Sequence, residues 1–198
     1  MTEVALKLAE LGYYTFMERP KGTEMPIVSE LKGLGLELPD DYAAFLTEFP
    51  ETGMFDREVA FRGRHPSPWA YASGADGLEA LYGWCRSDYE AFDIFHIRDQ
   101  YLDEFGPSYL AIGEMPGGSR VVMSCAGKDK GRIYAWDHEQ DPGVGKGFYL
   151  AFDDFSSFID ALFEEEEQES YADDTDERVH YGINLRSWLR GILGKNKT

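Results

Sequence analysis

Hydrophobic side chains recur at helical spacing in four segments of the chain. Such a stripe places its members on one helix face, which is normally the face that packs into a core. The four segments cover residues 4–11, 40–49, 92–102 and 153–163. Asp40 and Asp153 stand at the beginning of the second and fourth stripes, where aspartate is a favourable N-cap. Gly12 and Gly106-Pro107 follow the first and third, so these two helices are expected to end there.

Between the third and fourth helices, the pattern changes to short apolar runs separated by turns. These runs cover residues 109–112, 120–125, 132–137 and 148–152, and an earlier run lies near 58–62. Pro116-Gly117-Gly118 is typical of a tight turn between the first two. Consecutive strands joined by short turns form an antiparallel meander, and no strand–helix alternation indicates a parallel sheet. The sequence therefore predicts an α+β fold: an antiparallel sheet meander with helices packed on one face.

The charge is distributed unevenly along the 198 residues, which include 37 acidic and 19 basic side chains for a net charge of −18. Residues 160–177 contain ten carboxylates and no Lys or Arg, whereas residues 179–198 contain basic side chains and no acid. Within the latter, Leu185, Trp188, Leu189 and Ile192 form an apolar stripe. We therefore predict one domain over residues 1–165, an acidic linker over 166–182 and a basic amphipathic helix over 183–198. That helix is left open as a membrane, partner or self-binding element.

The negative charge excludes some functions. Phosphate backbones and anionic membrane surfaces attract Lys and Arg, so we expect neither direct nucleic-acid binding nor membrane binding, and cationic partners are favoured. Residues 1–4 do not resemble a signal peptide and no apolar run of about 18 residues occurs, which predicts a cytoplasmic protein. Cys85 and Cys125 form no CxxC pair and are expected to be reduced and buried.

Familiar catalytic patterns are missing from the sequence. Gly145-Lys146 is followed by Gly147 rather than by the Ser or Thr of a phosphate-binding loop, and neither GxSxG nor HExxH occurs. The densest group of potential ligands is Asp137-His138-Glu139. On a strand, Asp137 and Glu139 would share a face that His138 does not. Such a carboxylate pair is half of a metal site, a paired acid and base or, as we expect, the polar end of an exposed strand. No catalytic residue, metal or cofactor is predicted, although a Ser, His and Asp brought together by folding are left open.

Four segments, taken together, resemble the Smi/Knr type of the SUKH superfamily. Residues 36–46 are similar to its opening helix, with the pattern Leu-Pro-x-x-Tyr-x-x-Phe-Leu. The remaining similar segments are a strand with its glycine turn at 109–119, a Gly-x-x-x-x-Trp-Asp-His-Glu strand at 131–139 and a closing helix at 152–159. They occur in family order across about residues 34–165. Glu51-Thr52-Gly53 replaces the family's Asn-Gly-Gly turn, and Asp154 replaces its serine before the closing phenylalanine.

The resemblance implies an α+β domain without enzymatic activity that acts through protein contacts. Bacterial members resemble immunity proteins of polymorphic toxin systems, which bind and neutralise a cognate toxin such as a nuclease or deaminase. Fungal relatives resemble regulators of cell-wall synthesis. We therefore expect an immunity protein for a basic toxin, since an acidic protein is steered towards a basic groove. The alternatives are an intracellular regulatory scaffold and a small metal-assisted hydrolase. The oligomeric state is not predicted.

The candidate contacts with this partner lie at strand and loop ends. They are the acids Glu114, Asp137, Glu139 and Asp141 and the aromatic Trp69. Trp69 lies in a loop with two prolines, and it is expected either to anchor an interface or to cover a core edge. Replacing Asp137 and Glu139 by Lys is expected to weaken partner capture with little change in melting temperature.

Overall fold

The computed structural model describes residues 2–17, 26–85, 87–140 and 146–165. Within these residues, one antiparallel sheet has the strand order β1-β2-β3-β4-β5-β6-β7, and β8 pairs with β2. The strands are β1 (Tyr13–Thr15), β2 (Gly53–Phe61), β3 (Asp76–Leu81), β4 (Tyr109–Glu114), β5 (Arg120–Ser124), β6 (Ile133–Trp136), β7 (Phe148–Phe152) and β8 (Phe163–Glu164). Each strand along this path pairs with the next one in the chain, which confirms the α+β class and the antiparallel meander.

Six α-helices accompany the sheet in the described part of the chain. They are α1 (Glu3–Glu10), α2 (Ile27–Gly33), α3 (Asp40–Glu48), α4 (Ile94–Gln100), α5 (Leu102–Phe105) and α6 (Phe155–Asp160). The shorter 3-10 turns are η1 (Ser87–Phe92), η2 (Pro116–Gly118) and η3 (Gly127–Asp129). The four predicted helices are present, the third of them divided into α4 and α5 at Tyr101.

The two predicted N-caps are each wrong by one residue. Pro39 is the N-cap of α3, and Asp40 is already its first helical residue. Helix α6 is capped by Asp154, whose carboxylate accepts a hydrogen bond from the amide of Ser157 at 2.7 Å. Asp153 instead pairs with Arg64 at 2.5 Å. A carboxylate caps a helix by reaching the amide three residues later, and Asp154 is the residue whose extended backbone permits this.

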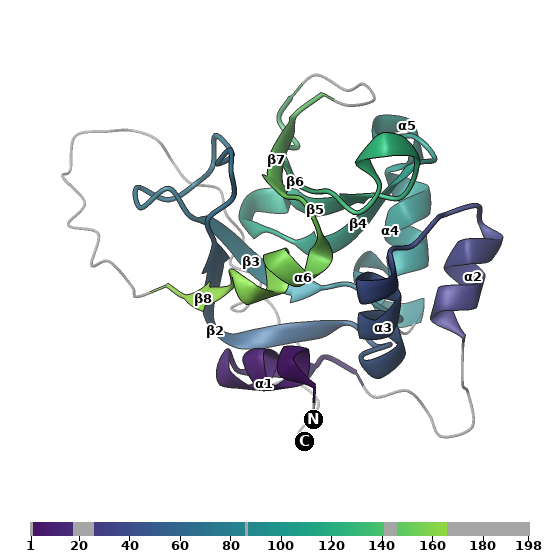
Figure 1. The fold of residues 1–198 in the computed structure, drawn as a ribbon, viewed down its shortest axis with the longest axis horizontal. Helices are drawn as coiled ribbons and strands as arrows, with labels where there is room; N and C mark the ends of the chain where they lie inside the picture. Colours follow the sequence, from purple (N-terminus) through teal and green to yellow (C-terminus); the bar gives the residue numbers. More distant parts are fainter. Residues whose placement is uncertain (1, 18–25, 86, 141–145, 166–198) are drawn as a thin grey trace.

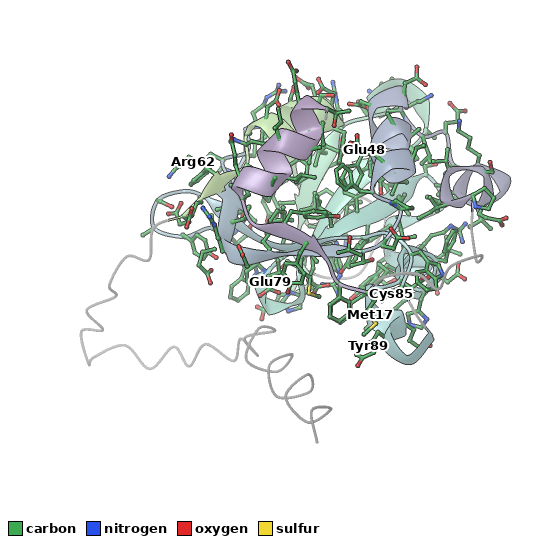
Figure 2. The ribbon with its side chains drawn as sticks, turned by 90° about the horizontal axis from the view of Figure 1, so that it is seen from below. Met17, Glu48, Arg62, Glu79, Cys85 and Tyr89 are labelled. Atoms are coloured by element: carbon green, nitrogen blue, oxygen red, sulfur yellow. The ribbon has the colours of Figure 1, made fainter. Side chains whose placement is uncertain are left out.

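Helices contact both faces of the sheet. Figure 1 shows α6 lying across the sheet, and α1 and α3 pack beside it. Phe158 of α6 contacts Phe61 and Phe152, with ring centroids 5.3 and 5.7 Å away. On the other face, Phe105 of α5 contacts Trp136 of β6 at 4.9 Å. Figure 2 shows Glu48 of α3 and Tyr89 of η1 on opposite sides of the sheet. The predicted arrangement, with helices on one face of the sheet, therefore holds for α1, α3 and α6. Helices α4 and α5 cover the other face as well.

Strand β7 supplies side chains to both faces because it contains a bulge. Leu150 is paired with Tyr134, whereas Phe152 is paired with Ile133, so Ala151 is an extra residue. Phe148 contacts Phe105 on the α5 side, and Phe152 contacts Phe158 on the α6 side. Regular alternation would place positions 148 and 152 on the same face. The bulge reverses the side-chain alternation in the second half of the strand, so this one short strand packs against helices on both faces of the sheet.

The outer edge of β7 is covered by the segment that follows β2. The amides of Arg64 and His65 donate hydrogen bonds to the carbonyls of Ala151 and Leu150, both at 3.0 Å. A Cβ atom at Gly63 would lie 2.8 Å from that of Ala151, so only glycine permits this approach. Residues 63–65 therefore protect a sheet edge and anchor the β2–β3 connection beside β7.

Candidate protein-interaction site

Three connections meet at one end of the sheet. In an antiparallel meander, every second connection lies at the same end, so the β2–β3, β4–β5 and β6–β7 connections come together. The first carries Trp69, the second follows Glu114, and the third begins with Asp137 and Glu139. Four of the five predicted contact residues thus belong to one end of the fold. Asp141 lies outside the described residues.

Asp137 is the polar centre of this region, with only 2% of its surface exposed. Its Oδ1 atom accepts hydrogen bonds from the indole Nε1 of Trp69 at 2.8 Å and from the amide of Glu139 at 3.0 Å. Its Oδ2 atom accepts from Nε2 of Gln140 at 3.1 Å. Burial raises the pKa of Asp137, but the hydrogen bonds outweigh this effect and hold its pKa below the ordinary value. The carboxylate therefore stays anionic and fixes three donors.

The burial of Asp137 contradicts the surface position expected from the sequence. Strand β6 ends at Trp136. The alternation of side chains along a strand, which would place Asp137 and Glu139 on the same face, therefore does not extend to these two residues. Asp137 instead folds back onto the amide two residues later, as aspartate does in an Asx turn. Glu139 and His138 are exposed. A substitution at Asp137 therefore changes the structure of the loop as well as its charge.

Trp69 is 43% exposed although its indole nitrogen is bonded. Its ring lies against the imidazole of His138, with centroids 6.2 Å apart and an interplanar angle of 28°. Nδ1 of His138 lies 3.2 Å from the hydroxyl oxygen of Ser119 in the β4–β5 connection. The indole ring is thus held by the hydrogen bond at its nitrogen and by contact with the imidazole. Much of the remaining ring surface faces solvent. Sequence reasoning missed the contribution of His138 and Ser119, because their contacts depend on the convergence of separate loops.

The loop that carries Trp69 is held by the buried Asp76 at the start of β3. The carboxylate of Asp76 accepts hydrogen bonds from the hydroxyl of Ser67 at 2.5 Å and from its amide at 3.2 Å. The hydroxyl oxygen of Ser67 accepts in turn from the amide of Trp69 at 3.1 Å. Burial raises the pKa of Asp76, and the bonds from Ser67 partly oppose this shift. These two residues position the tryptophan backbone, and no motif in the sequence identified them.

Glu114 supports the neighbouring turn and is not the surface acid expected from the sequence. Its side chain is 12% exposed, and its Oε1 atom accepts from Nη1 of Arg120 at 2.7 Å. Its Oε2 atom accepts from the hydroxyl of Tyr82. Burial raises the pKa of Glu114, whereas Arg120 and Tyr82 lower it. Arg120 also donates to the carbonyls of Gly118 and Ser119, at 2.6 and 2.9 Å. The pair therefore fixes the turn that presents Ser119 to His138.

The exposed side chains of these loops form what we call the docking ridge: Trp69, Tyr71, His138 and Glu139. Tyr71 is 39% exposed, and its hydroxyl would lie 2.5 Å from a Cβ atom at Gly77. The absent side chain at Gly77 therefore lets Tyr71 lie close to β3. The ridge offers aromatic surface, an imidazole and a carboxylate on a rigid base. This combination suits contact with another protein.

No group of three or more His, Cys, Asp and Glu residues is placed to hold a metal ion in the part of the chain that the structure describes. None of the helices described is long and apolar enough to cross a membrane.

Comparison with known proteins identifies one family. The model of the SMI1/KNR4 family (SUKH-1) matches residues 31–161, from within α2 to the C-cap of α6. This range contains all three connections that form the docking ridge. No match is found among curated proteins.

Proposed function

Since the chain belongs to the SMI1/KNR4 family (SUKH-1), which confirms the resemblance seen in its sequence, we propose that it is a non-enzymatic immunity protein. It acts in the cytoplasm by binding and neutralising a cognate toxin that carries a basic surface. The observation that carries this proposal is the docking ridge, in which a rigidly held tryptophan remains 43% exposed. Its indole nitrogen already has a partner in Asp137, so the exposed ring is available for contact with a second protein.

The rigidity of the ridge supports a role in binding. Ordering a mobile side chain costs about 0.5–1.5 kcal/mol on association, and a side chain that is already ordered avoids that cost. Tryptophan is also the residue type most often found at the energetic centre of protein interfaces. Trp69 is fixed at its backbone by Ser67, at its edge by Asp137 and on its ring by His138.

The overall charge supports a basic partner. A net charge of −18 attracts a positively charged surface over distances longer than a contact and raises the rate of encounter. We propose Trp69 and Glu139 as direct contacts, with Asp137 and Glu114 as residues that position them. Asp141 remains a predicted contact, and it lies outside the described residues. The predicted acidic linker at 166–182 and the predicted basic amphipathic helix at 183–198 also lie outside them.

The proposal is tested by capture followed by neutralisation. The tagged full chain is incubated with lysate of its native host, washed at low and then at high salt, and the bound proteins are identified by mass spectrometry. We expect one dominant basic protein that is released by salt. Its expression alone should stop growth of a test host, and co-expression of the chain should restore growth.

A matched pair of variants links the activity to the ridge. Trp69→Ala should lose capture and protection, whereas Tyr14→Ala, which removes a 45% exposed aromatic residue from β1, should retain both. Several unrelated and non-toxic partners would instead favour the regulatory scaffold. Capture that is equally strong with Trp69→Ala would remove the docking ridge from the proposal.

A further inference from the structure

Trp69 and Glu139 are tied to a single atom. The indole Nε1 of Trp69 and the amide of Glu139 both donate to Oδ1 of Asp137, at 2.8 and 3.0 Å. The position of the exposed ring and that of the glutamate backbone are therefore fixed relative to each other. Two residues from connections far apart in the sequence thus form one unit, organised around a buried anion.

Glu139 adds an exposed negative charge to this unit. The side chain of Glu139 is exposed, and among the residues that the structure describes it makes no ion pair. Arg62 reaches the same connection as Trp69, where it donates to the carbonyl of Ser73 at 3.5 Å. Its guanidinium, however, lies over the ring of Phe163 at 4.3 Å. The exposed indole and the exposed carboxylate of Glu139 therefore belong to one unit, and Arg62 is engaged outside it.

We propose that the exposed surface of Trp69 and the carboxylate of Glu139 receive an arginine side chain of the protein partner. The face of an indole attracts cations, and the planar guanidinium both stacks on the ring and donates two hydrogen bonds to one carboxylate. A lysine ammonium provides the charge without the stacking or the paired donors. This inference rests on the proposed function, because it names the chemistry by which the same ridge recognises its partner.

A peptide titration tests the recognition directly. The full chain, labelled with nitrogen-15, is titrated with a synthetic peptide of alternating glycine and arginine, while the indole N–H signals are recorded. The chain has four tryptophans, so the other three report on non-specific effects in the same spectrum. The spectrum of Trp69→Phe identifies the signal of Trp69. We expect the arginine peptide to shift that signal, its lysine version to bind about two- to fivefold more weakly, and its neutral citrulline version to leave the signal in place.

Two variants with the same charge change separate local recognition from general attraction. Glu139→Gln should lower the affinity for the arginine peptide by about two- to fivefold. Glu10→Gln, at an exposed position of α1, should leave it unchanged. Equal losses in both variants, or a Trp69 signal that responds equally to citrulline, would overturn the proposed arginine contact.

The outcomes for the arginine contact and for the proposed function are distinguishable. If the chain captures and neutralises a toxin but the Trp69 signal ignores the arginine peptide, the arginine contact is wrong and the immunity function stands. If the peptide binds as expected but no toxin is neutralised, the immunity function is wrong and the ridge remains an arginine-binding surface.

Discussion

Replacing Asp137 by alanine should release the docking ridge from the body of the protein. The substitution removes an anionic acceptor for the side chains of Trp69 and Gln140 and for the amide of Glu139. A hydrogen bond to a charged group contributes about 1.5–3 kcal/mol when it is fully buried. Water can reach the donors once the carboxylate is gone, because Trp69, Glu139 and Gln140 are exposed. We therefore expect a total loss of about 2–3 kcal/mol, or roughly 4–12 °C in melting temperature.

The loss is measured by urea unfolding followed by circular dichroism. The midpoint should fall without a change in slope, because the surface exposed on unfolding stays the same. Asp137→Asn retains an oxygen acceptor in place of Oδ1 and loses the bond from Gln140, so it should cost about 1 kcal/mol. Glu139→Ala serves as the matched control, since removing this exposed neighbour should change stability by less than about 0.5 kcal/mol. Equal stability of Asp137→Ala and Glu139→Ala would refute the role of Asp137 as the anchor of the ridge.

Three further predictions follow from buried residues. Gly53→Ala should destabilise the protein by about 1–3 kcal/mol in the same urea assay, because its Cβ would lie 2.1 Å from the ring of Tyr13. Gly33→Ala, whose added Cβ atom would meet nothing within 4 Å beyond its own helix and its chain neighbours, should cost nothing. Asp76→Asn should reduce the gain in stability on acidification from about pH 7 to pH 4. Burial raises the pKa of Asp76, so the native state binds a proton at a higher pH than the unfolded chain does. Protonation of Asp76 therefore stabilises the native state at low pH, and this stabilisation is lost as the pH rises through the raised pKa. Identical pH profiles of stability for the wild type and Asp76→Asn would contradict this prediction. The thiol of Cys125, whose pKa burial raises to about 12, should react with a disulfide reagent only as fast as the protein unfolds, and rapid reaction in the native state would contradict its burial.

The sequence predicted those elements whose hydrophobic pattern has a clear period. The stripes of α3 and α6 and the short runs of β4 to β7 each identified an element. Strand β3 was not predicted because almost all of its residues are buried, so polar positions do not alternate with apolar ones. Helix α2 has seven residues and strand β1 has three, which is too short for a period to be recognised.

The candidate site was predicted in position but not in internal arrangement. The meander places Trp69 and Asp137 at one end of the sheet, since they follow strands that leave the sheet at that end. The sequence does not reveal which acid is buried, because burial depends on donors supplied by other loops. The carboxylate of Asp137 accepts a hydrogen bond from the indole of Trp69, and that of Glu114 forms an ion pair with Arg120. The carboxylate of Glu139 has neither of these partners. Identical carboxylates therefore receive different roles from contacts between residues that are distant in the sequence.

The contact between residues 63–65 and β7 also has a consequence for the order of folding. It joins parts of the chain that lie far apart, and closing so large a loop is slow compared with forming the β6–β7 hairpin. Until that closure, β7 presents a row of open backbone groups to solvent. Open strand edges pair readily with other chains at high concentration. Refolding by dilution should therefore give a yield that falls as protein concentration rises, because closure of this edge competes directly with self-association.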